Sequence, residues 1–277
     1  MTGAVPQLCF TLMAPYGSWG ASLSSATTAW KATDLDPPKS ALVGLLGAAL
    51  GVARPELGQL AASLFVAVRT GLRPLRDPRP DYHTVGRARR PDGARRWTRF
   101  EELTKTPGGQ GPAGALLSKR EYWACGLWTV AVASRGGRAS LAPLAAALVH
   151  PHRVLYAGRK SCTLGLPPDP EIVDAPGPVA ALAAYGWPWQ RRPGLAAAPA
   201  LGPLIALREA AGNTDVLAFD PDFPGAPAPT GEVVQRAVRR RDRPHPLALA
   251  GGRIYQRFHE RTEIRMAFPD ATPVGEG

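Results

Sequence analysis

The sequence predicts an α+β fold in which two strand–helix–strand units are joined by a long basic insertion. Apolar runs that predict strands lie at residues 7–12, 63–70 and 120–134, and a further apolar stretch begins at residue 153. Helical patterns occupy residues 37–54 and 141–151. The resulting βαββαβ order is that of the ferredoxin-like arrangement, which RRM-like RNA-binding domains share.

Prolines mark the limits of both predicted helices. The first helix begins after Pro37 and Pro38, and Pro55 follows its end. Proline is favoured in the first turn of a helix and soon after its last turn, where it cannot continue the hydrogen bonding. The second helix ends at Pro151 by the same rule.

The insertion between the two units is strongly basic. Residues 69–99 hold ten Arg against three Asp, a local net charge of +7. Pro91-Asp92-Gly93 is a turn signal in the middle of this stretch. Two Arg-rich arms around a turn, with few apolar residues, predict a long β-hairpin thumb between about residues 79 and 115.

The hydrophobic patterns that predict strands and helices become weaker after residue 170. We therefore place the boundary between two regions there. Residues 1–170 are expected to form the ferredoxin-like domain with its thumb, and residues 171–277 a smaller β-rich region of strands and Pro/Gly-rich loops. Residues 174–203 are rich in Pro, Ala and Gly, and residues 237–246 form a second basic cluster. Alternating polarity over residues 251–268 predicts a terminal strand or hairpin.

Composition limits the class of protein. The 277 residues carry 33 Lys and Arg against 22 Asp and Glu, a net charge of +11, which favours a polyanionic partner such as nucleic acid. The chain has no apolar run of the ~18–20 residues that a membrane span needs, and its start lacks the basic segment of a secretory signal. Three widely spaced cysteines, Cys9, Cys125 and Cys162, predict neither disulfides nor zinc. We therefore expect a cytoplasmic protein without a metal or cofactor.

Basic and aromatic residues of the thumb are candidate RNA contacts. Arg89 and Arg90 precede the turn, and Arg95 and Arg96 follow it, so the two arms are placed to grip phosphates. Tyr82 offers a flat face on which an unpaired base can stack. Basic residues interleaved with aromatics are more specific to nucleic-acid binding than a basic run alone.

Three further segments are candidate anion or base sites. Arg159, Lys160 and Ser161 lie in a Gly-rich loop whose N–H groups are suited to cradling a phosphate, although the P-loop spacing is absent. Lys39 and Ser40 stand at a helix start, where free N–H groups attract anions. Trp19, in the YGSWG segment, is either a core residue or a base-stacking platform.

The residues also allow other functions. His83 lies beside Tyr82 in the basic segment, and with Lys39 it is a candidate set for a metal-independent endoribonuclease that processes precursor RNA. Motifs of zinc proteases and serine hydrolases are absent. A basic α/β module for protein partners is the third possibility.

Several segments together resemble the CasD family of type I-E CRISPR systems, in the RAMP superfamily. The resemblance runs in order over residues 7–168 and is carried by LMAPYGSWG, PPKSALVGLLGAALGV, DYHTV, REYW and YAGRKSC. Two segments depart from the family pattern. Thr27, Thr28 and Lys31 stand where the family has an Arg-containing stretch, and Cys125-Gly126 replaces an Asp-Ala pair.

The resemblance implies a non-catalytic antiviral-defence subunit of the Cascade ribonucleoprotein complex. Such a subunit binds the crRNA 5′ handle and caps the backbone filament of CasC-like subunits beside a CasA-like large subunit, and the assembled complex holds target DNA. A separate CasE-type subunit cuts the precursor. By position, the resemblance assigns RNA contacts to Trp19, Gly20, Lys39, Ser40, Tyr82, His83, Thr84, Arg87, Arg89, Arg90, Arg159, Lys160 and Ser161. Lys31 is a further candidate, as a replacement for the missing family Arg.

Overall fold

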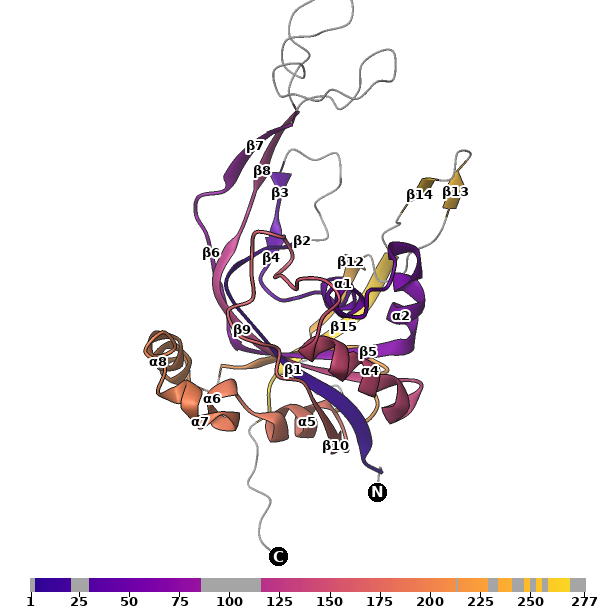
Figure 1. Ribbon diagram of the computed structural model, residues 1–277, viewed down its shortest axis with the longest axis vertical. Coiled ribbons are helices and arrows are strands. Elements are labelled where there is room, and N and C mark those ends of the chain that lie inside the picture. Colours follow the sequence, from indigo (N-terminus) through magenta and orange to yellow (C-terminus); the bar gives the residue numbers. More distant parts are fainter. Residues whose placement is uncertain are drawn as a thin grey trace, which may run out of the picture.

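A computed structural model gives the fold as a large antiparallel sheet with helices on both faces (Figure 1). It describes residues 3–20, 30–85, 116–212, 214–228, 234–240, 247–249, 253–255 and 259–269. The predicted hairpin tip near residues 91–93 lies outside the described residues. The mixed α+β class is the one that the sequence predicts.

The main sheet follows the order β10-β1-β9-β5-β11-β15-β12, with every neighbouring pair antiparallel. A short strand, β6 (Leu75–Arg76), pairs with the beginning of β9. The strands of the sheet are β1 (Val5–Gly17), β5 (Leu64–Leu72), β9 (Trp123–Ser134), β10 (Glu171–Ala175), β11 (Val216–Phe219), β12 (Val234–Arg240) and β15 (His259–Ala267).

The first part of the sheet is built in βαββαβ order. Helices α1 (Lys39–Leu50) and α2 (Leu57–Ser63) connect β1 to β5, and α4 (Gly137–Val149) connects β9 to β10. The short 3-10 helix η1 (Arg54–Glu56) precedes α2. The strands predicted at residues 7–12, 63–70 and 120–134 and both helices are confirmed. The strand predicted from residue 153 is wrong, because glycines and prolines make this stretch an irregular loop, and the edge strand begins only at Glu171.

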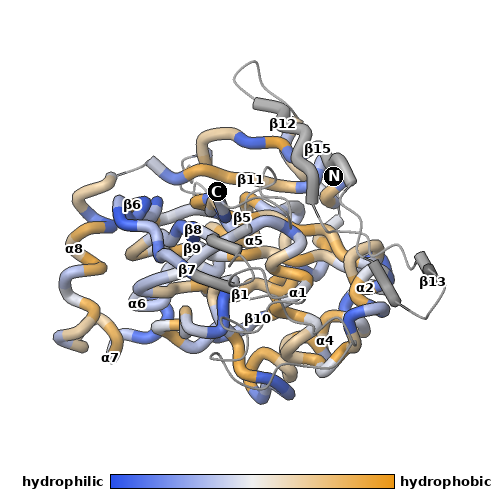
Figure 2. Tube along the Cα trace, turned by 90° about the horizontal axis from the view of Figure 1, so that it is seen from above, coloured by the Kyte–Doolittle hydropathy of each residue, from blue (hydrophilic) through white to orange (hydrophobic). Residues whose placement is uncertain are grey.

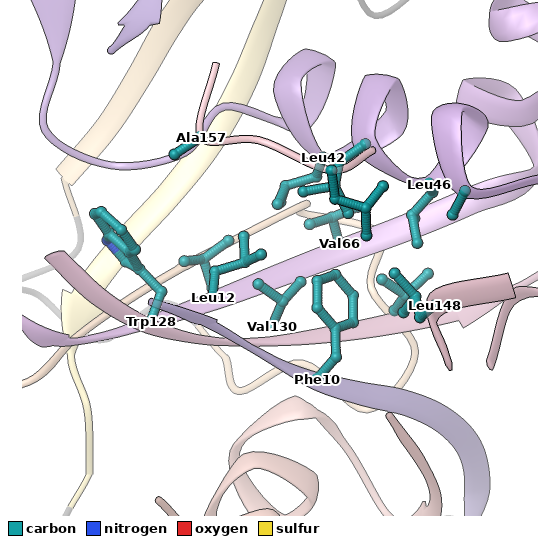
Figure 3. Close-up of a cluster of buried hydrophobic side chains, with 14 of the residues drawn as sticks. Phe10, Leu12, Leu42, Leu46, Val66, Trp128, Val130, Leu148 and Ala157 are labelled. Carbon is teal, nitrogen blue, oxygen red and sulfur yellow. The ribbon is translucent and has the colours of Figure 1, made fainter. Parts of the chain in front are cut away.

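Two hydrophobic cores explain why the central strands are apolar on both faces. Phe10 and Leu12 of β1 pack with α1 and α4, together with Val130 of β9 (Figure 3). Cys9 lies between these positions in the chain and points to the opposite face, where it packs with Leu182 of α5 (Pro178–Tyr185). Successive side chains of a strand alternate between faces, so a strand covered on both sides becomes an unbroken apolar run.

The C-terminal region is more helical than the sequence predicts. Residues 174–203 contain α5, α6 (Pro188–Arg191), α7 (Pro193–Ala196) and the start of α8 (Gly202–Ala210). A proline occupies the first turn of each helix, which is the position that tolerates its missing N–H. The loop prediction for this segment is therefore wrong, because these prolines begin helices instead of breaking them.

The main sheet continues across residue 170. Strands β11, β12 and β15 extend the same sheet beyond β5. The sequence predicts a terminal strand or hairpin at residues 251–268, and β15 confirms the terminal strand. A hairpin within this segment is not formed in the described residues, because β14 (Arg253–Tyr255) pairs with β13 (Leu247–Leu249), whereas β15 pairs with β12 and β11. No helix within the described ranges is long and apolar enough to cross a bilayer.

A smaller three-stranded sheet, here called the projecting sheet, extends away from the main sheet (Figure 1). It consists of β3 (Trp30–Lys31), β8 (Leu116–Arg120) and β7 (Asp81–Val85) in that order. β7 and β8 are antiparallel, and β7 lies at the start of the predicted thumb while β8 directly follows its end. β3 is parallel to β8. Two short strands, β2 (Trp19–Gly20) and β4 (Thr33–Asp34), pair with each other. In the chain, β2 precedes β3 and β4 follows it.

Candidate nucleic-acid interface

Segments distant in sequence meet where the projecting sheet joins the main sheet. The N–H of Ser18, after β1, donates to the carbonyl of Ala157 at 3.1 Å. The hydroxyl of Ser18 donates to the carbonyl of Glu121, which links β8 to β9, at 3.0 Å. The end of β1, the Gly-rich loop and the root of the projecting sheet therefore form one structure, here called the thumb base.

The Gly-rich loop can approach β1 only because residue 158 is glycine. Gly158 has φ +82°, a conformation that side chains other than glycine adopt rarely. A Cβ atom at this position would lie 1.8 Å from the carbonyl oxygen of Ser18. The glycine is thus required by the packing of this loop.

Arg159 lies on a stack of two tyrosines. The rings of Tyr16 and Tyr122 are stacked with centroids 4.8 Å apart and planes 18° from parallel. The guanidinium carbon of Arg159 lies 4.3 Å from the centre of the Tyr122 ring. Its Nη1 is buried without a hydrogen-bond partner among the described residues. Aromatic faces therefore hold this cation in place, and no carboxylate in the described ranges forms a salt bridge with it.

Tyr16 also fixes the segment that leads into β7. Its hydroxyl donates a hydrogen bond to the Asp77 carboxylate, which in addition accepts the N–H of Arg79 at 2.9 Å. The bond from Tyr16 is the main reason that the pKa of Asp77 lies below its usual value. Burial, reinforced by the bond to Asp77, raises the pKa of Tyr16, so this phenol stays protonated.

Glu121 holds an exposed tryptophan. Its carboxylate accepts the indole N–H of Trp30 at 2.6 Å and the backbone N–H of Thr33 at 3.1 Å, and it forms an ion pair with Arg76. Trp30 nevertheless remains 46% exposed. Because the indole nitrogen is bound, the ring has a defined orientation while much of its surface faces solvent.

Trp30, Lys119 and Tyr82 form a row across the three strands of the projecting sheet. Lys119 of β8 is the register partner of Trp30 on β3 and of Tyr82 on β7. Tyr82 is 60% exposed, and the Lys119 ammonium lies 5.5 Å from the centre of the Trp30 ring. The row places a cation between two accessible aromatic rings. In Figure 2 the chain beside β6 is mostly hydrophilic, although β6 itself contains the exposed Leu75.

Some predicted contact residues do gather at this site. Tyr82 and Lys31 lie on strands that both pair with β8, and Arg159 lies on Tyr122, two residues after β8. Lys160 and Ser161 are exposed in the loop beside Arg159. Gly20, at the end of β2, is exposed as well.

Two predicted RNA contacts are corrected by burial. Trp19 is only 2% exposed and packs against Trp123 and Trp128, with ring centroids 5.5 and 5.7 Å away, so it is a core residue and cannot stack on a base. Lys39 donates to the Asp220 carboxylate at 2.9 Å and to the Leu64 carbonyl at 2.7 Å.

The proposed anion sites change accordingly. With Lys39 engaged by Asp220, the start of α1 does not present the predicted cation, and Ser40 beside it is partly buried. In the Gly-rich loop, the N–H groups of Gly158, Cys162 and Gly165 donate to protein carbonyls. These three N–H groups are therefore not available to a phosphate, and the predicted cradle is reduced to the other N–H groups and the side chains of the loop.

The remaining predicted residues belong to the thumb. His83 lies on β7 with its Nε2 3.5 Å from a carboxylate oxygen of Asp81. The side chain of Thr84 and all of Arg87, Arg89, Arg90, Arg95 and Arg96 lie outside the described residues, so their roles stay predictions. The described residues contain no cluster of three His, Cys, Asp or Glu side chains suited to a metal ion.

The sequence reasoning missed several residues of the thumb base. Trp30, Lys119, Glu121 and Tyr122 were not candidates, although three of them flank or form the REYW segment that carries the family resemblance. A signal was available in that segment, where a charged pair directly precedes two aromatics. Its meaning depends on β3, whose two residues are too few to form a recognisable strand pattern.

Comparison with known proteins places the chain in a family. The family model described as "CRISPR-associated protein (Cas_Cas5)" matches residues 7–239. No curated protein matches the sequence significantly.

Two solved structures share the fold. A chain of a structure described as "CRISPR RNA-guided surveillance complex" aligns with a TM-score of 0.55 and 18% identity, covering 95% of this chain and 90% of that one. A structure described as "Crystal structure of Cas protein" aligns with a TM-score of 0.50 and 23% identity, covering 95% of both chains. The family match over most of the sequence agrees with the resemblance to CasD, and the chain belongs to the Cas5 family of CRISPR-associated proteins.

Proposed function

We propose that this chain is a crRNA-binding subunit of a type I-E CRISPR surveillance complex. It binds the 5′ handle of the guide RNA with a ferredoxin-like RAMP domain and a thumb rooted in β7 and β8. It caps the backbone filament of CasC-like subunits next to a CasA-like large subunit. The fold shared with a chain of a CRISPR RNA-guided surveillance complex supports the assignment to such an assembly.

The observation that carries the proposal is the gathering of cations and exposed aromatics at the thumb base. Arg159 lies on Tyr122, and the row of Trp30, Lys119 and Tyr82 crosses the adjoining projecting sheet. Basic side chains neutralise phosphates, and exposed rings stack on unpaired bases. This combination suits single-stranded RNA better than an acidic protein surface.

We further propose that the subunit does not cut RNA. The candidate catalytic set was Tyr82, His83 and Lys39. Tyr82 and His83 are neighbours on β7, so their side chains point to opposite faces of the strand. Lys39 is only 11% exposed and is bound to Asp220. These three groups therefore do not converge on one reacting phosphate, which favours a binding role.

The binding proposal is tested with the full chain and a guide RNA from its own system. Affinity should fall with salt, with a log–log slope of about −0.7 for each phosphate neutralised on single-stranded RNA. The double variant Arg159→Ala/Lys160→Ala should bind more weakly and with a shallower slope. Arg138→Ala is the matched control, because it removes an exposed arginine from α4 at the other end of the fold. Binding that is independent of salt would contradict the proposal.

The non-catalytic proposal is tested by incubating the chain with precursor crRNA in the presence of a metal chelator. We expect the RNA to stay intact, and His83→Ala to behave like wild type. Cleavage at one position of the repeat, abolished in His83→Ala, would instead establish the endoribonuclease.

A further inference from the structure

We propose that Trp30 and Tyr82 are two separate base-stacking platforms that receive two unpaired, mutually unstacked bases of one RNA strand, with the intervening phosphate on Lys119. This inference rests on the proposed RNA-binding function and names the form of RNA that the projecting sheet accepts: a single strand whose bases are splayed apart.

The register of the projecting sheet puts the three side chains on one face. Trp30 and Tyr82 are both opposite Lys119, one from the parallel strand β3 and the other from the antiparallel strand β7. Residues at matching positions of neighbouring strands project from the same side of a sheet. The two rings therefore share the face from which Lys119 also projects.

The separation of the rings determines which RNA conformation fits. Neighbouring strands lie about 4.8 Å apart, so residues on the first and third strands are roughly 10 Å apart. Stacked bases of a helical strand are spaced by only about 3.4 Å. Two stacked neighbours cannot each cover one ring, whereas two splayed bases, or bases with one nucleotide between them, can do so.

Trp30 is held ready for such a contact. Its indole N–H is bound to Glu121, and the carboxylate of Glu121 is fixed in turn by the N–H of Thr33 and by Arg76. An exposed ring that is already fixed in one orientation loses little further freedom when a base stacks on it. The hydrogen-bonded and yet 46% exposed ring is therefore arranged as a docking surface.

The charge between the rings favours RNA over an apolar peptide. Lys119 forms no salt bridge with a carboxylate in the described part of the chain, and its ammonium lies near the Trp30 ring. The phosphate that joins two splayed bases has to cross the strand between the two rings, which is β8. Lys119 is on that strand, so one cation meets one phosphate.

Abasic substitution in the guide RNA tests the platforms. One base at a time is removed from the 5′ region, and the affinity of each RNA is measured with wild type, Trp30→Ala and Tyr82→Ala. On intact RNA, each variant should bind about 5- to 100-fold more weakly, the range expected for loss of one stacked base. Each variant should also become insensitive to removal of one particular base, and the two bases should not be stacked neighbours.

Matched variants separate stacking from general damage. Tyr82→Phe keeps the ring and should retain most of the affinity. Trp30→Phe keeps a ring but loses the bond to Glu121, so it should bind more tightly than Trp30→Ala and more weakly than wild type. Leu75→Ala removes another exposed apolar side chain, 75% accessible on nearby β6, and should bind like wild type. Thermal melting should be nearly unchanged for Tyr82→Ala, which confirms that its loss of affinity does not arise from unfolding.

The outcomes distinguish this inference from the function on which it rests. If wild type binds the guide RNA in a salt-dependent way but Trp30→Ala and Tyr82→Ala bind equally well, the platforms are wrong and the RNA-binding function stands. If the alanine variants lose a protein subunit of the complex while keeping RNA affinity, the row is a protein contact and the inference is overturned. If wild type does not bind guide RNA at all, both proposals fall.

Discussion

Two clusters of this molecule combine the same three groups, an arginine, a carboxylate and a tryptophan, with different results. In one, Arg69 of β5 binds Asp215 at 2.7 Å and lies 4.4 Å from the centre of the Trp187 ring. In the other, at the thumb base, Glu121 binds both Arg76 and the indole N–H of Trp30. The chemical groups are similar, and the two clusters differ in how much of their side chains is exposed to solvent.

The buried cluster is complete in itself. The side chain of Asp215 has no exposed surface, that of Arg69 is 13% exposed, and Trp187 is 5% exposed. The ion pair joins Arg69 of β5 to Asp215, which directly precedes β11. At the thumb base, Arg76 is 48% and Trp30 46% exposed. The comparison shows that a cluster of charged and aromatic side chains only stabilises the fold when it is buried. When one side of the cluster faces solvent, its side chains are also able to bind a ligand.

The largest predicted effect is on the buried cluster. Asp215→Ala leaves Arg69 and Arg208, which binds the other oxygen of the same carboxylate at 2.6 Å, without their counter-charge. Removing one partner of a buried ion pair typically costs about 3–5 kcal/mol in the free energy of unfolding. Denaturant unfolding measures this change.

Asp174→Ala is the control for that measurement. Its carboxylate pairs with Arg138 at the surface, where both side chains are about half exposed, so we expect a loss of about 0–1 kcal/mol. Equal losses in the two variants would contradict the role given to burial.

A smaller effect on stability is expected at the thumb base. Glu121→Gln keeps an oxygen acceptor but loses the charge opposite Arg76, so the free energy of unfolding should fall by only about 1 kcal/mol or less. Guide-RNA affinity should fall severalfold, because the single amide oxygen cannot serve both Trp30 and the donors Thr33 and Arg76, so the Trp30 ring is held less firmly. A large loss of stability with unchanged RNA affinity would make Glu121 a structural residue like Asp215.

The thumb base should also show a pH dependence that can be assigned to one pair. The hydrogen bond from Tyr16 lowers the pKa of Asp77, so this carboxylate stabilises the fold above its unfolded pKa of about 3.9, and the contribution is lost as pH falls through its lower folded value. The melting temperature of Tyr16→Phe should therefore be lower than that of wild type at pH 7. This difference should shrink below about pH 4, and a constant difference would exclude Asp77 as its source.

The last prediction needs no substitution and concerns the reactivity of the three cysteines toward a thiol reagent in the native protein. Cys9 and Cys162 are buried, and burial raises the pKa of Cys9 to about 12 and also raises that of Cys162. Cys125 is exposed. Because the thiolate is the reactive form, Cys125 should react first with a thiol reagent and the other two only on unfolding. Mass spectrometry of peptides identifies the labelled position, and early labelling of Cys162 would show that the Gly-rich loop opens readily.

The sequence alone determined the order of the main elements, because this order is written in local patterns. The unbroken apolar run of β1, the prolines that bracket α1 and the turn signals between strands are all readable without knowledge of contacts. The family could be recognised in the same way from short segments such as DYHTV and REYW. The helices of residues 174–203 could not be predicted in this way, since a proline that begins a helix and one that breaks it look alike in sequence.

The functional residues were decided by tertiary structure. Trp19 and Trp30 lie eleven positions apart, each near glycine, serine or charged residues, and the family resemblance assigns an RNA contact to Trp19 and none to Trp30. Packing against Trp123 and Trp128 encloses Trp19, whereas β8 and Glu121, some ninety residues away, support Trp30 at the surface. Likewise, Arg69 belongs to the basic stretch of the sequence, but in the structure it forms a buried ion pair with Asp215. Burial and ion pairing depend on partners that are distant in the chain, so local pattern cannot distinguish a cation or ring that holds the fold together from one that remains available to RNA.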